Sequence, residues 1–541
     1  MPRSMMVAFR RLLFIISRLY FPIVSCFFTF VNYFCTKRCV HAPEDKLLLI
    51  SATEAAKMIR NREITSVDLI KAYVKRINEV NDIINAVVQM NFEDALVKAQ
   101  EVDELLDNLD RSTVQFKNLV LEKPLLGVPF TLKDSIEADS LYCTIGILSR
   151  KNIVSKKDAV VVQRMKDAGA ILLAVTNVPE VCMWWESFNV IYGRTKNPYD
   201  SRRIAGGSSG GEAALVASAG SVIGIGSDIA GSIRMPSYFN GIFGLKPTPG
   251  VVPIEGHLPL IDGYRTDKML CIGPICRYAK DLPLLLRIFA GSEGMKLLQL
   301  HNSYNMKKIR LFYMEGLKTP LVPEVNEECY RALRKETAIK WFKKSHAVRY
   351  LELKYNLSAI RVDLPFAHYA LEFFLTSMED INAPKFSMYM ADLKGDVNCF
   401  VETLKWLVGN SDHTLPAIIT GIADEYFAPF TEKQKQKLKN QRDRLIREVT
   451  ELLSNDAVLL FPAFPTVAPY HHQPLFVPLN FGYTALWNTL AVPVIQCPVG
   501  LNDYNIPLGV QVIGAPGSDF LLISVAQDLE EAFGGWKALQ K

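Results

Sequence analysis

The chain has 541 residues, of which 49% are hydrophobic, 22% charged and 10% aromatic, and this composition excludes a disordered, collagen-like or low-complexity protein. Its 61 Lys and Arg residues stand against 56 Asp and Glu residues, a net charge of +5. Residues 1–40 contain six basic residues and no acidic one, so the rest of the chain has a net charge of −1. That balance predicts no nucleic-acid partner.

The ten cysteines are scattered along the chain, and no C-x-x-C motif occurs. The spacing does not fit a zinc site, and the number is too small for a disulfide scaffold in a chain of this length. We therefore expect free thiols, most of them in the core, and no metal.

An apolar segment occupies residues 12–35, with Arg18 as its only charge and Pro22 as its only proline. About 20 apolar residues are enough to cross a bilayer as a helix. The alternatives are a cleaved signal peptide and an interfacial hairpin broken at Pro22. No small-x-small cleavage site ends the run, so we predict a retained membrane anchor within residues 1–40.

Basic residues flank this segment unequally, with four before or inside it and two after it. The positive-inside rule then favours a cytoplasmic N-terminus. The difference is small, so the side of the membrane stays open. We expect a single-pass anchor in an endomembrane, either the endoplasmic reticulum or a lipid droplet.

The body begins with helix signals. The motifs Ser51-Ala-Thr-Glu54 and Thr65-Ser-Val-Asp68 match the capping box that starts a helix. A third helix is predicted over residues 92–107.

Short apolar runs then alternate with helical stretches, which predicts an α/β architecture around a central sheet. The predicted helices cover roughly residues 158–168, 212–219, 483–490 and 519–532. The apolar runs are Gly127–Leu132, Ala170–Val175, Ser221–Gly226, Val458–Phe461, Val492–Cys497 and Leu508–Ile513.

Residues 290–455 contain more Lys and Glu and weaker strand signals, which predicts a helical insert. Within it, residues 399–430 gather apolar side chains that include Phe400, Leu404 and Leu407. Three interpretations are open: a core helix, the wall of a substrate channel, or a surface that enters lipid. Core packing is the default expectation.

Residues 206–250 hold eleven of the 31 glycines, a density typical of backbone that turns sharply or approaches a ligand. A phosphate-binding loop is excluded, because no lysine follows the glycines and no strand precedes them. The sequence Gly206-Gly-Ser208-Ser-Gly210 matches the G-x-S-x-G elbow of α/β-hydrolases, but that motif also needs a preceding strand. None of the eight histidines has a telling sequence context, and the adjacent pair 471–472 is interpreted as loop residues.

A third interpretation rests on a longer pattern. GGSSGGEAALVA followed by GIGSDIAGSIRMPSYFNGIFGLKP resembles the signature region of the amidase signature family, and LGVPFTLKD resembles its lysine segment. The resemblance runs from about residue 48 to the C-terminus. It includes TNVPE, YGRTKNPYD, PTVAPYHH and PLGVQVIG. Within the family, the membrane-anchored branch that hydrolyses fatty acid amides is the most similar.

The resemblance implies a central mixed sheet covered by helices on both faces, with residues 41–541 as the catalytic domain. It implies a membrane-anchored serine hydrolase that cleaves fatty acid amides, such as N-acylethanolamines or primary amides, to a fatty acid and an amine. No metal or organic cofactor is implied. The oligomeric state stays open, although family members with membrane caps are commonly dimers, which suggests a homodimer. The alternatives are a hydrolase of other N-acyl conjugates and a catalytically impaired lipid-binding homologue.

The resemblance also assigns the reacting residues. Ser232 is the nucleophile, and Ser208, preceded by a cis peptide bond, bridges it to Lys133. Lysine serves as a base only when its amine is largely neutral, and burial after an apolar strand provides that. Backbone N–H groups of Ile229, Ala230, Gly231 and Ser232 form the oxyanion site.

The alanine at position 230 departs from the pattern, because most members have glycine there. Alanine would be strained by roughly 1 kcal/mol if the backbone needed a positive φ, and harmless otherwise. We expect Ser209, Asp228 and Arg234 to hold the loop by hydrogen bonds and an ion pair without taking part in the chemistry.

Overall fold

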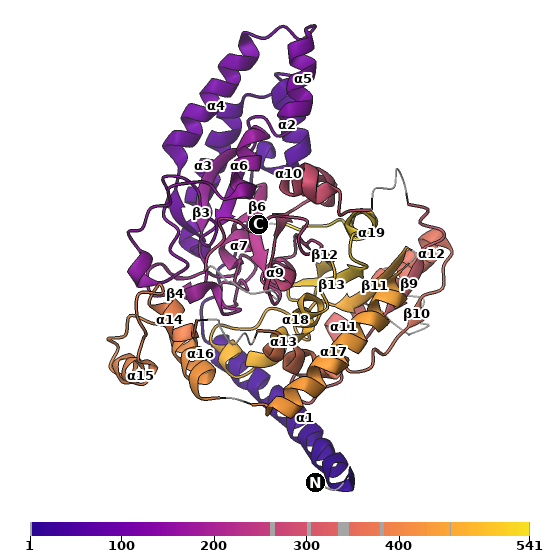
Figure 1. Cartoon of the computed structure of the whole chain (residues 1–541). Helices are drawn as coiled ribbons and strands as arrows, with labels where there is room; N and C mark the ends of the chain where they lie inside the picture. Colours follow the sequence, from indigo (N-terminus) through magenta and orange to yellow (C-terminus); the bar gives the residue numbers. More distant parts are fainter. Residues whose placement is uncertain are drawn as a thin grey trace.

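The computed structural model describes residues 3–259, 266–299, 304–333, 346–378, 384–427, 429–454 and 456–539. Within them, eleven strands form one mixed sheet in the order β1-β3-β2-β6-β8-β7-β12-β13-β11-β9-β10 (Figure 1). The strands are β1 Val87–Met90, β2 Pro129–Lys133, β3 Ile171–Thr176, β6 Ile223–Asp228, β7 Phe243–Lys246, β8 Cys271–Cys276, β9 Arg310–Tyr313, β10 Ile360–Arg361, β11 Ala457–Pro462, β12 Val494–Leu501 and β13 Pro507–Gly514. A separate hairpin pairs β4 Phe188–Asn189 with β5 Gly193–Arg194.

Helices surround this sheet. They are α1 Arg3–Tyr33, α2 Ala52–Arg60, α3 Ser66–Ile84, α4 Phe92–Asp107, α5 Val114–Glu122, α6 Val160–Asp167, α7 Gly210–Ala217, α8 Arg234–Phe239, α9 Thr266–Met269, α10 Leu282–Met295, α11 Glu327–Leu333, α12 Ala347–Tyr355, α13 Ala370–Met378, α14 Phe386–Met390, α15 Cys399–Leu407, α16 Leu415–Tyr426, α17 Glu432–Leu453, α18 Gly482–Thr489 and α19 Asp519–Phe533. All ten cysteines are free, as predicted.

Alternate residues of the central strands face opposite helical layers. In β11, Val458 and Leu460 belong to the core cluster shared with α19, whereas Leu459 and Phe461 belong to the cluster shared with α17 and α18. A strand that is buried on both sides in this way lies inside a sheet covered by helices on both faces. The predicted architecture is therefore confirmed.

The six predicted apolar runs are all strands, namely β2, β3, β6, β11, β12 and β13. The five other strands of the sheet were not predicted. The sequences of β7 and β8, FGLK and CIGPIC, contain glycine or proline, which weakens any local strand signal. Their pairing partners in the sheet, and not their own sequence, make them strands.

The predicted helix starts are confirmed by their caps. The Ser51 hydroxyl accepts a hydrogen bond from the Glu54 N–H at 3.2 Å, and the Thr65 hydroxyl accepts one from the Asp68 N–H at 2.9 Å. Helix α4 has the predicted bounds.

Helix α1 continues without a break through Pro22, so a hairpin at that residue is excluded. Its segment Arg11–Tyr33 is long and apolar enough to cross a membrane, and only 11% of its most apolar window is buried. The helix is fastened to the body on one side. Val24 and Phe28 are buried there, and the Tyr20 hydroxyl donates to the Phe476 carbonyl at 2.9 Å.

The described residues of the region 290–455 are largely helical, but they also contribute β9 and β10, and β9 pairs with β11 in the main sheet. This region is therefore continuous with the central sheet. The default expectation for residues 399–430 is wrong, because α15 is not a core helix. Phe400, Leu404 and Leu407 are 53%, 66% and 68% exposed.

Candidate active site

Three parallel strands end at one edge of the sheet. Strand β2 pairs in parallel with β3 and with β6, so their carboxyl ends meet, as they do at the ligand sites of open α/β sheets. Lys133 is the last residue of β2, and Ser232 follows four residues after the end of β6. Topology therefore brings together two of the predicted residues.

Ser208 lies in the turn that precedes α7. Lys133 Nζ is 2.6 Å from Ser208 Oγ, and the two residues are 1% and 2% exposed. The peptide bond between Gly207 and Ser208 is cis, as the resemblance implied. The contact joins the end of β2 to the start of α7 inside the protein.

Ser232 lies beside this pair. The N–H of Ser209 donates to the carbonyl oxygen of Ser232 at 3.1 Å, so the two serine loops run next to each other. Ser232 is 8% exposed. The structure thus brings Lys133 into direct contact with Ser208 and places Ser232 against the residue that follows Ser208.

Burial lowers the pKa of Lys133 below its usual range, and the neighbouring Cys182, Asp228 and Glu212 oppose this shift only in part. Desolvation penalises an ammonium group more than a neutral amine. A larger fraction of Lys133 is therefore neutral at a given pH than for an exposed lysine, which is what a base requires.

Glu212 is a fully buried carboxyl group whose pKa burial raises to about 8. It contacts the hydroxyls of Thr131 at 2.8 Å and Thr176 at 2.9 Å. A carboxyl group with such a pKa is largely protonated at neutral pH, so it favours the ammonium form of Lys133 less than an ionised carboxylate would.

The loop after β6 is built around a buried ion pair. Arg234 Nε donates to Asp228 Oδ2 at 3.0 Å, and both side chains are fully buried. Although burial alone raises the pKa of the Asp228 carboxyl, the Arg234 guanidinium holds it well below its usual range. The same carboxylate also accepts from the Gly231 N–H at 2.7 Å and the Ile233 N–H at 3.1 Å.

This arrangement changes the expected set of oxyanion donors. The N–H of Gly231, which the resemblance assigned to the oxyanion site, donates to Asp228. The N–H groups of Ile229, Ala230 and Ser232 donate to no acceptor within the described part of the chain. Of the four N–H groups that the resemblance assigned, these three therefore stay without an acceptor in the described structure.

Ala230 does not have a positive φ, so its side chain is tolerated without backbone strain. Gly231 is the position that requires glycine. Its φ is +123°, and an added Cβ would collide with the side chain of Thr484. The Thr484 hydroxyl donates to the Ala230 carbonyl at 2.6 Å, which joins the loop after β6 to α18.

These conformations predict opposite results for two neighbouring substitutions. Ala230→Gly should leave kcat within about twofold of wild type, because it relieves no strain. Gly231→Ala should destabilise the protein by about 3 kcal/mol or more and disrupt the loop, because it combines a clash with an unfavourable φ. Thermal unfolding and amide-hydrolysis rates measure both. A large gain in rate from Ala230→Gly would contradict the assignment.

Sequence reasoning missed two buried neighbours of the lysine. Lys133 Nζ donates to Ser227 Oγ at 2.9 Å, and Ser227 Oγ lies 2.9 Å from His257 Nε2. Ser227 lies within the glycine-rich motif and could have been suspected there. His257 has no sequence signal, because it is 124 positions from Lys133 and meets it only in the folded chain.

The adjacent histidines are loop residues with partners. His471 Nδ1 lies 2.8 Å from Glu186 Oε1, and its Nε2 lies 3.1 Å from the Ser201 carbonyl oxygen. Among the described residues, no group of three or more His, Cys, Asp or Glu side chains could hold a metal ion.

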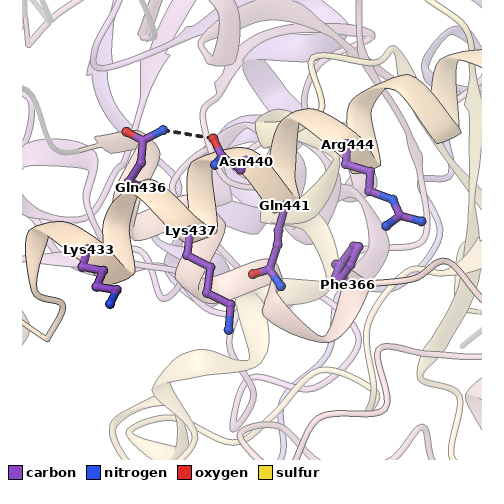
Figure 2. Close-up of a pocket in the computed structure, with 7 residues that line it drawn as sticks. All are labelled: Phe366, Lys433, Gln436, Lys437, Asn440, Gln441 and Arg444. Atoms are coloured by element: carbon purple, nitrogen blue, oxygen red, sulfur yellow. Dashed lines mark hydrogen bonds between the residues drawn. The ribbon is translucent and has the colours of Figure 1, made fainter.

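A hollow of about 640 Å³ lies on the surface along α17 (Figure 2). Arg444 stacks over Phe366 at one end, 5.5 Å from the ring centre. None of its lining residues is a predicted site residue. The candidate site is therefore identified by the contact between Lys133 and Ser208 and not by the size of a cavity. The lining residues are Phe366, Lys433, Gln436, Lys437, Asn440, Gln441 and Arg444.

Comparison with known proteins decides the family. The family model described as Amidase matches residues 68–523. The chain belongs to the amidase family. Human fatty-acid amide hydrolase 2 is 41% identical to this amidase over 498 residues, covering 91% of the chain and 90% of the relative. Fatty-acid amide hydrolase 2-A of Danio rerio is 40% identical over 501 residues, covering 91% and 90%.

Solved structures support the same fold. A structure of fatty acid amide hydrolase superposes on this amidase with a TM-score of 0.71 at 22% identity, covering 91% of this chain and 86% of that one. Together with the family match, the relatives identify this amidase as a hydrolase of carbon–nitrogen bonds in linear amides, other than peptide bonds.

Proposed function

We propose that this amidase is a membrane-attached serine hydrolase that releases a fatty acid from long-chain fatty acid amides, such as N-acylethanolamines and primary amides. The observation that carries the proposal is the buried contact between Lys133 and Ser208 beside Ser232. Residues 1–40 are the anchor, and residues 41–541 are the catalytic domain. Relatives that are 40% and 41% identical, fatty-acid amide hydrolases by name, support the substrate class.

Attack begins with a proton relay. An amide is a weak electrophile, so Ser232 must lose its proton as it attacks the carbonyl carbon. The proton passes to Ser208, whose own proton passes to the neutral amine of Lys133. The 2.6 Å separation of Lys133 Nζ and Ser208 Oγ supports the second transfer.

The tetrahedral intermediate carries negative charge on the former carbonyl oxygen. The N–H groups of Ile229, Ala230 and Ser232 are its donors, while Gly231 N–H stays on Asp228. One such donor typically contributes about 3 kcal/mol to lowering the barrier. The Asp228–Arg234 ion pair keeps these donors aligned.

The relay then runs in reverse. Lys133, now an ammonium group, returns its proton through Ser208 to the nitrogen of the leaving amine, and the carbon–nitrogen bond breaks. An ester of Ser232 with the fatty acid remains. Water hydrolyses this ester with the same relay, which regenerates the free serine.

The surroundings of the oxyanion loop suit an apolar acyl group. Ile229 and Ala230 belong to an apolar cluster that includes Phe374 and Phe481, whose rings pack edge to face with centres 5.4 Å apart. Burying an alkyl chain there contributes about 0.8 kcal/mol per methylene. The apolar character of this cluster supports the proposed preference for a long acyl chain.

Two exposed apolar surfaces support attachment to lipid. One is the outer side of α1, and the other is the α15–α16 patch, which we define as Phe400, Val401, Leu404, Trp406, Leu407, Val408, Ile419, Tyr426 and Phe427. Helices α1, α15 and α16 lie in the lower part of Figure 1, and α4 and α5 lie at its top. Large exposed apolar patches mark interaction surfaces.

The α15–α16 patch is tied to the active site through a buried carboxylate. Glu180 Oε1 lies 2.6 Å from His413 Nδ1, and its other oxygen accepts from the Thr414 N–H at 2.7 Å. Glu180 begins the short helical turn that ends at Cys182, a neighbour of Lys133. The patch and the surroundings of Lys133 are thus connected by direct contacts, which supports entry of a lipid substrate from this side.

A double substitution tests the patch. Leu404→Asp with Leu407→Asp should raise KM for a long-chain N-acylethanolamine by about tenfold, because it removes exposed apolar area that partitions into lipid. The values of kcat, and KM for a short, water-soluble amide, should not change. The matched control is Val114→Asp with Leu121→Asp on α5, whose side chains are 71% and 80% exposed at the opposite end. An equal effect from the control pair would contradict the role of the patch.

The proposed substrate is tested by release of fatty acid in membranes that contain the full chain. A long-chain N-acylethanolamine and a primary amide should be hydrolysed faster than an N-acyl amino acid of the same acyl length. Faster hydrolysis of the acyl amino acid would agree with amidase activity but would contradict the proposed substrate class. Alanine at position 230 was the reason to consider a catalytically impaired homologue. Because the φ of Ala230 is not positive, alanine causes no backbone strain there, and that reason no longer applies. A homodimer and an endomembrane location stay predictions.

A further inference from the structure

A hydrogen-bonded row of three buried side chains runs from Lys133 through Ser227 to His257. Ser227 Oγ lies 2.9 Å from Lys133 Nζ and 2.9 Å from His257 Nε2. Ser227 and His257 are 3% and 5% exposed. Ser227 therefore links the lysine to a histidine that the proposed reaction does not use.

Backbone contacts hold His257 in this position. It lies in the loop after β7 and forms an isolated antiparallel bridge with Ile136, three residues after Lys133. The next residue, Leu258, donates its N–H to the Ser135 carbonyl at 2.7 Å. The backbone of His257 is thus held against the segment that follows β2, close to Lys133.

The His257 ring is neutral at working pH. Burial, together with the nearby charge of Lys133, lowers its pKa to about 3. A neutral imidazole carries one N–H donor and one acceptor nitrogen. His257 therefore acts on Ser227 by hydrogen bonding and not by charge.

The direction of the two hydrogen bonds of Ser227 Oγ depends on which groups carry protons. A protonated lysine has three N–H donors and no acceptor, so the Ser227 oxygen accepts from Lys133. With the ring proton on Nδ1, Nε2 of His257 is an acceptor, and the single O–H of Ser227 is then directed to it.

Once Lys133 is neutral, its amine has two N–H groups and one lone pair. Two hydroxyls compete for that lone pair, Ser208 at 2.6 Å and Ser227 at 2.9 Å. Only the bond from Ser208 leads to the nucleophile. If the Ser227 proton is held by His257, Ser227 stays an acceptor and the lone pair is left for Ser208.

We propose that His257 is a positioning residue that keeps the Ser227 hydroxyl as an acceptor for Lys133 and so directs the lysine lone pair to Ser208. This role rests on the proposed function, because it requires Lys133 to be the base.

Other groups near these side chains do not replace His257. Ser135 Oγ lies 3.4 Å from His257 Nε2, a longer contact than that of Ser227. The only charged side chain that shifts the pKa of His257 is Lys133. The titratable groups that face Lys133 are Cys182, Asp228 and Glu212.

The test is His257→Phe in the full chain, which keeps a ring and removes the acceptor. Ser227 is then free to donate to the neutral amine, which stabilises a deprotonated lysine that cannot accept from Ser208. The rate constant for labelling Ser232 with a fluorophosphonate, and kcat, should fall about tenfold at the high-pH plateau, the size expected for one hydrogen bond. The midpoint of the rising limb should move to lower pH, and KM should not change.

Two further variants separate positioning from packing. His257→Gln offers an amide oxygen as acceptor and should recover at least half of the wild-type rate. In a Ser227→Ala background the competing hydroxyl is absent, so His257→Phe should have no further effect, as a double-mutant cycle requires for a role exerted through Ser227. If His257→Phe does not fold, His257→Met replaces it, because methionine adapts to irregular space and lacks the acceptor.

The inference is overturned if His257→Phe follows the wild-type pH profile, or if it slows labelling equally with and without the Ser227 hydroxyl. Failure of the proposed function looks different: Ser232→Ala or Lys133→Met would then retain wild-type hydrolysis, whatever His257 does.

Discussion

Ser232→Ala is expected to lower kcat for amide hydrolysis by at least about 10⁴-fold and to abolish labelling by a fluorophosphonate. The substitution removes the only oxygen that can form the acyl-enzyme in the proposed reaction. Ser232 N–H is a donor to the oxyanion, and alanine keeps it. Oxyanion donors and substrate binding therefore remain, and any residual hydrolysis would come from them.

The fold should survive this change. The substitution removes one hydroxyl from a loop held by the fully buried Asp228–Arg234 ion pair, so the unfolding temperature should stay within a few degrees. Ser237→Ala is the matched control, because Ser237 is a fully buried serine whose hydroxyl has no partner in the described part of the chain. Turnover retained by Ser232→Ala, measured in membranes beside this control, would exclude Ser232 as the nucleophile.

Lys133→Met is expected to lower kcat by about 10²- to 10⁴-fold, the range for loss of a general base. Only the neutral amine accepts a proton, so the wild-type rate should rise with pH through the lowered pKa of Lys133. In the variant the sigmoidal rise to a plateau should vanish, and the residual rate should increase in proportion to hydroxide concentration without a plateau. Lys133→Arg should not rescue activity, because a guanidinium keeps its proton.

Lys246 provides a matched control for that experiment. It is a second fully buried lysine whose pKa burial lowers, and it ends β7 as Lys133 ends β2. Its Nζ donates to the Pro247 carbonyl at 3.2 Å, with no serine relay. Lys246→Met should therefore keep the sigmoidal rise of the pH profile. Loss of that rise in Lys246→Met, or its persistence in Lys133→Met, would place the base elsewhere.

Lys133→Met should lower activity without lowering the stability of the fold. A lysine whose pKa is lower in the folded than in the unfolded state costs stability below the unfolded pKa, because the unfolded chain binds more protons there. Stability of the wild type therefore rises with pH between the two values. Lys133→Met should unfold at the same or a higher temperature at neutral pH, as thermal melts at several pH values would measure.

Local patterns were enough for much of the fold. The six apolar runs are strands, the two serine and threonine caps are made, and α4 has its predicted bounds, because burial periodicity and capping act within a few residues of the chain. The glycine-rich motif and the lysine segment likewise pointed to Lys133, Ser208 and Ser232.

Other features depend on partners far along the chain. Strands β7 and β8 exist through their neighbours in the sheet. The apolar residues of α15 are exposed because, among the described residues, this helix packs mainly against its neighbour α16. From an apolar side chain in the sequence one can predict that it avoids water, but not whether protein or lipid covers it.

The sequence by itself determined the α/β class, the apolar first helix and the serines and lysine of the signature. The tertiary structure alone decided that Gly231 N–H is taken by Asp228, that Ala230 is unstrained, and that His257 reaches Ser227. The physical reason is that the direction of a hydrogen bond and the sign of a backbone angle depend on all the groups that surround a residue. Those groups come together only when distant segments of the chain pack against the same end of the sheet.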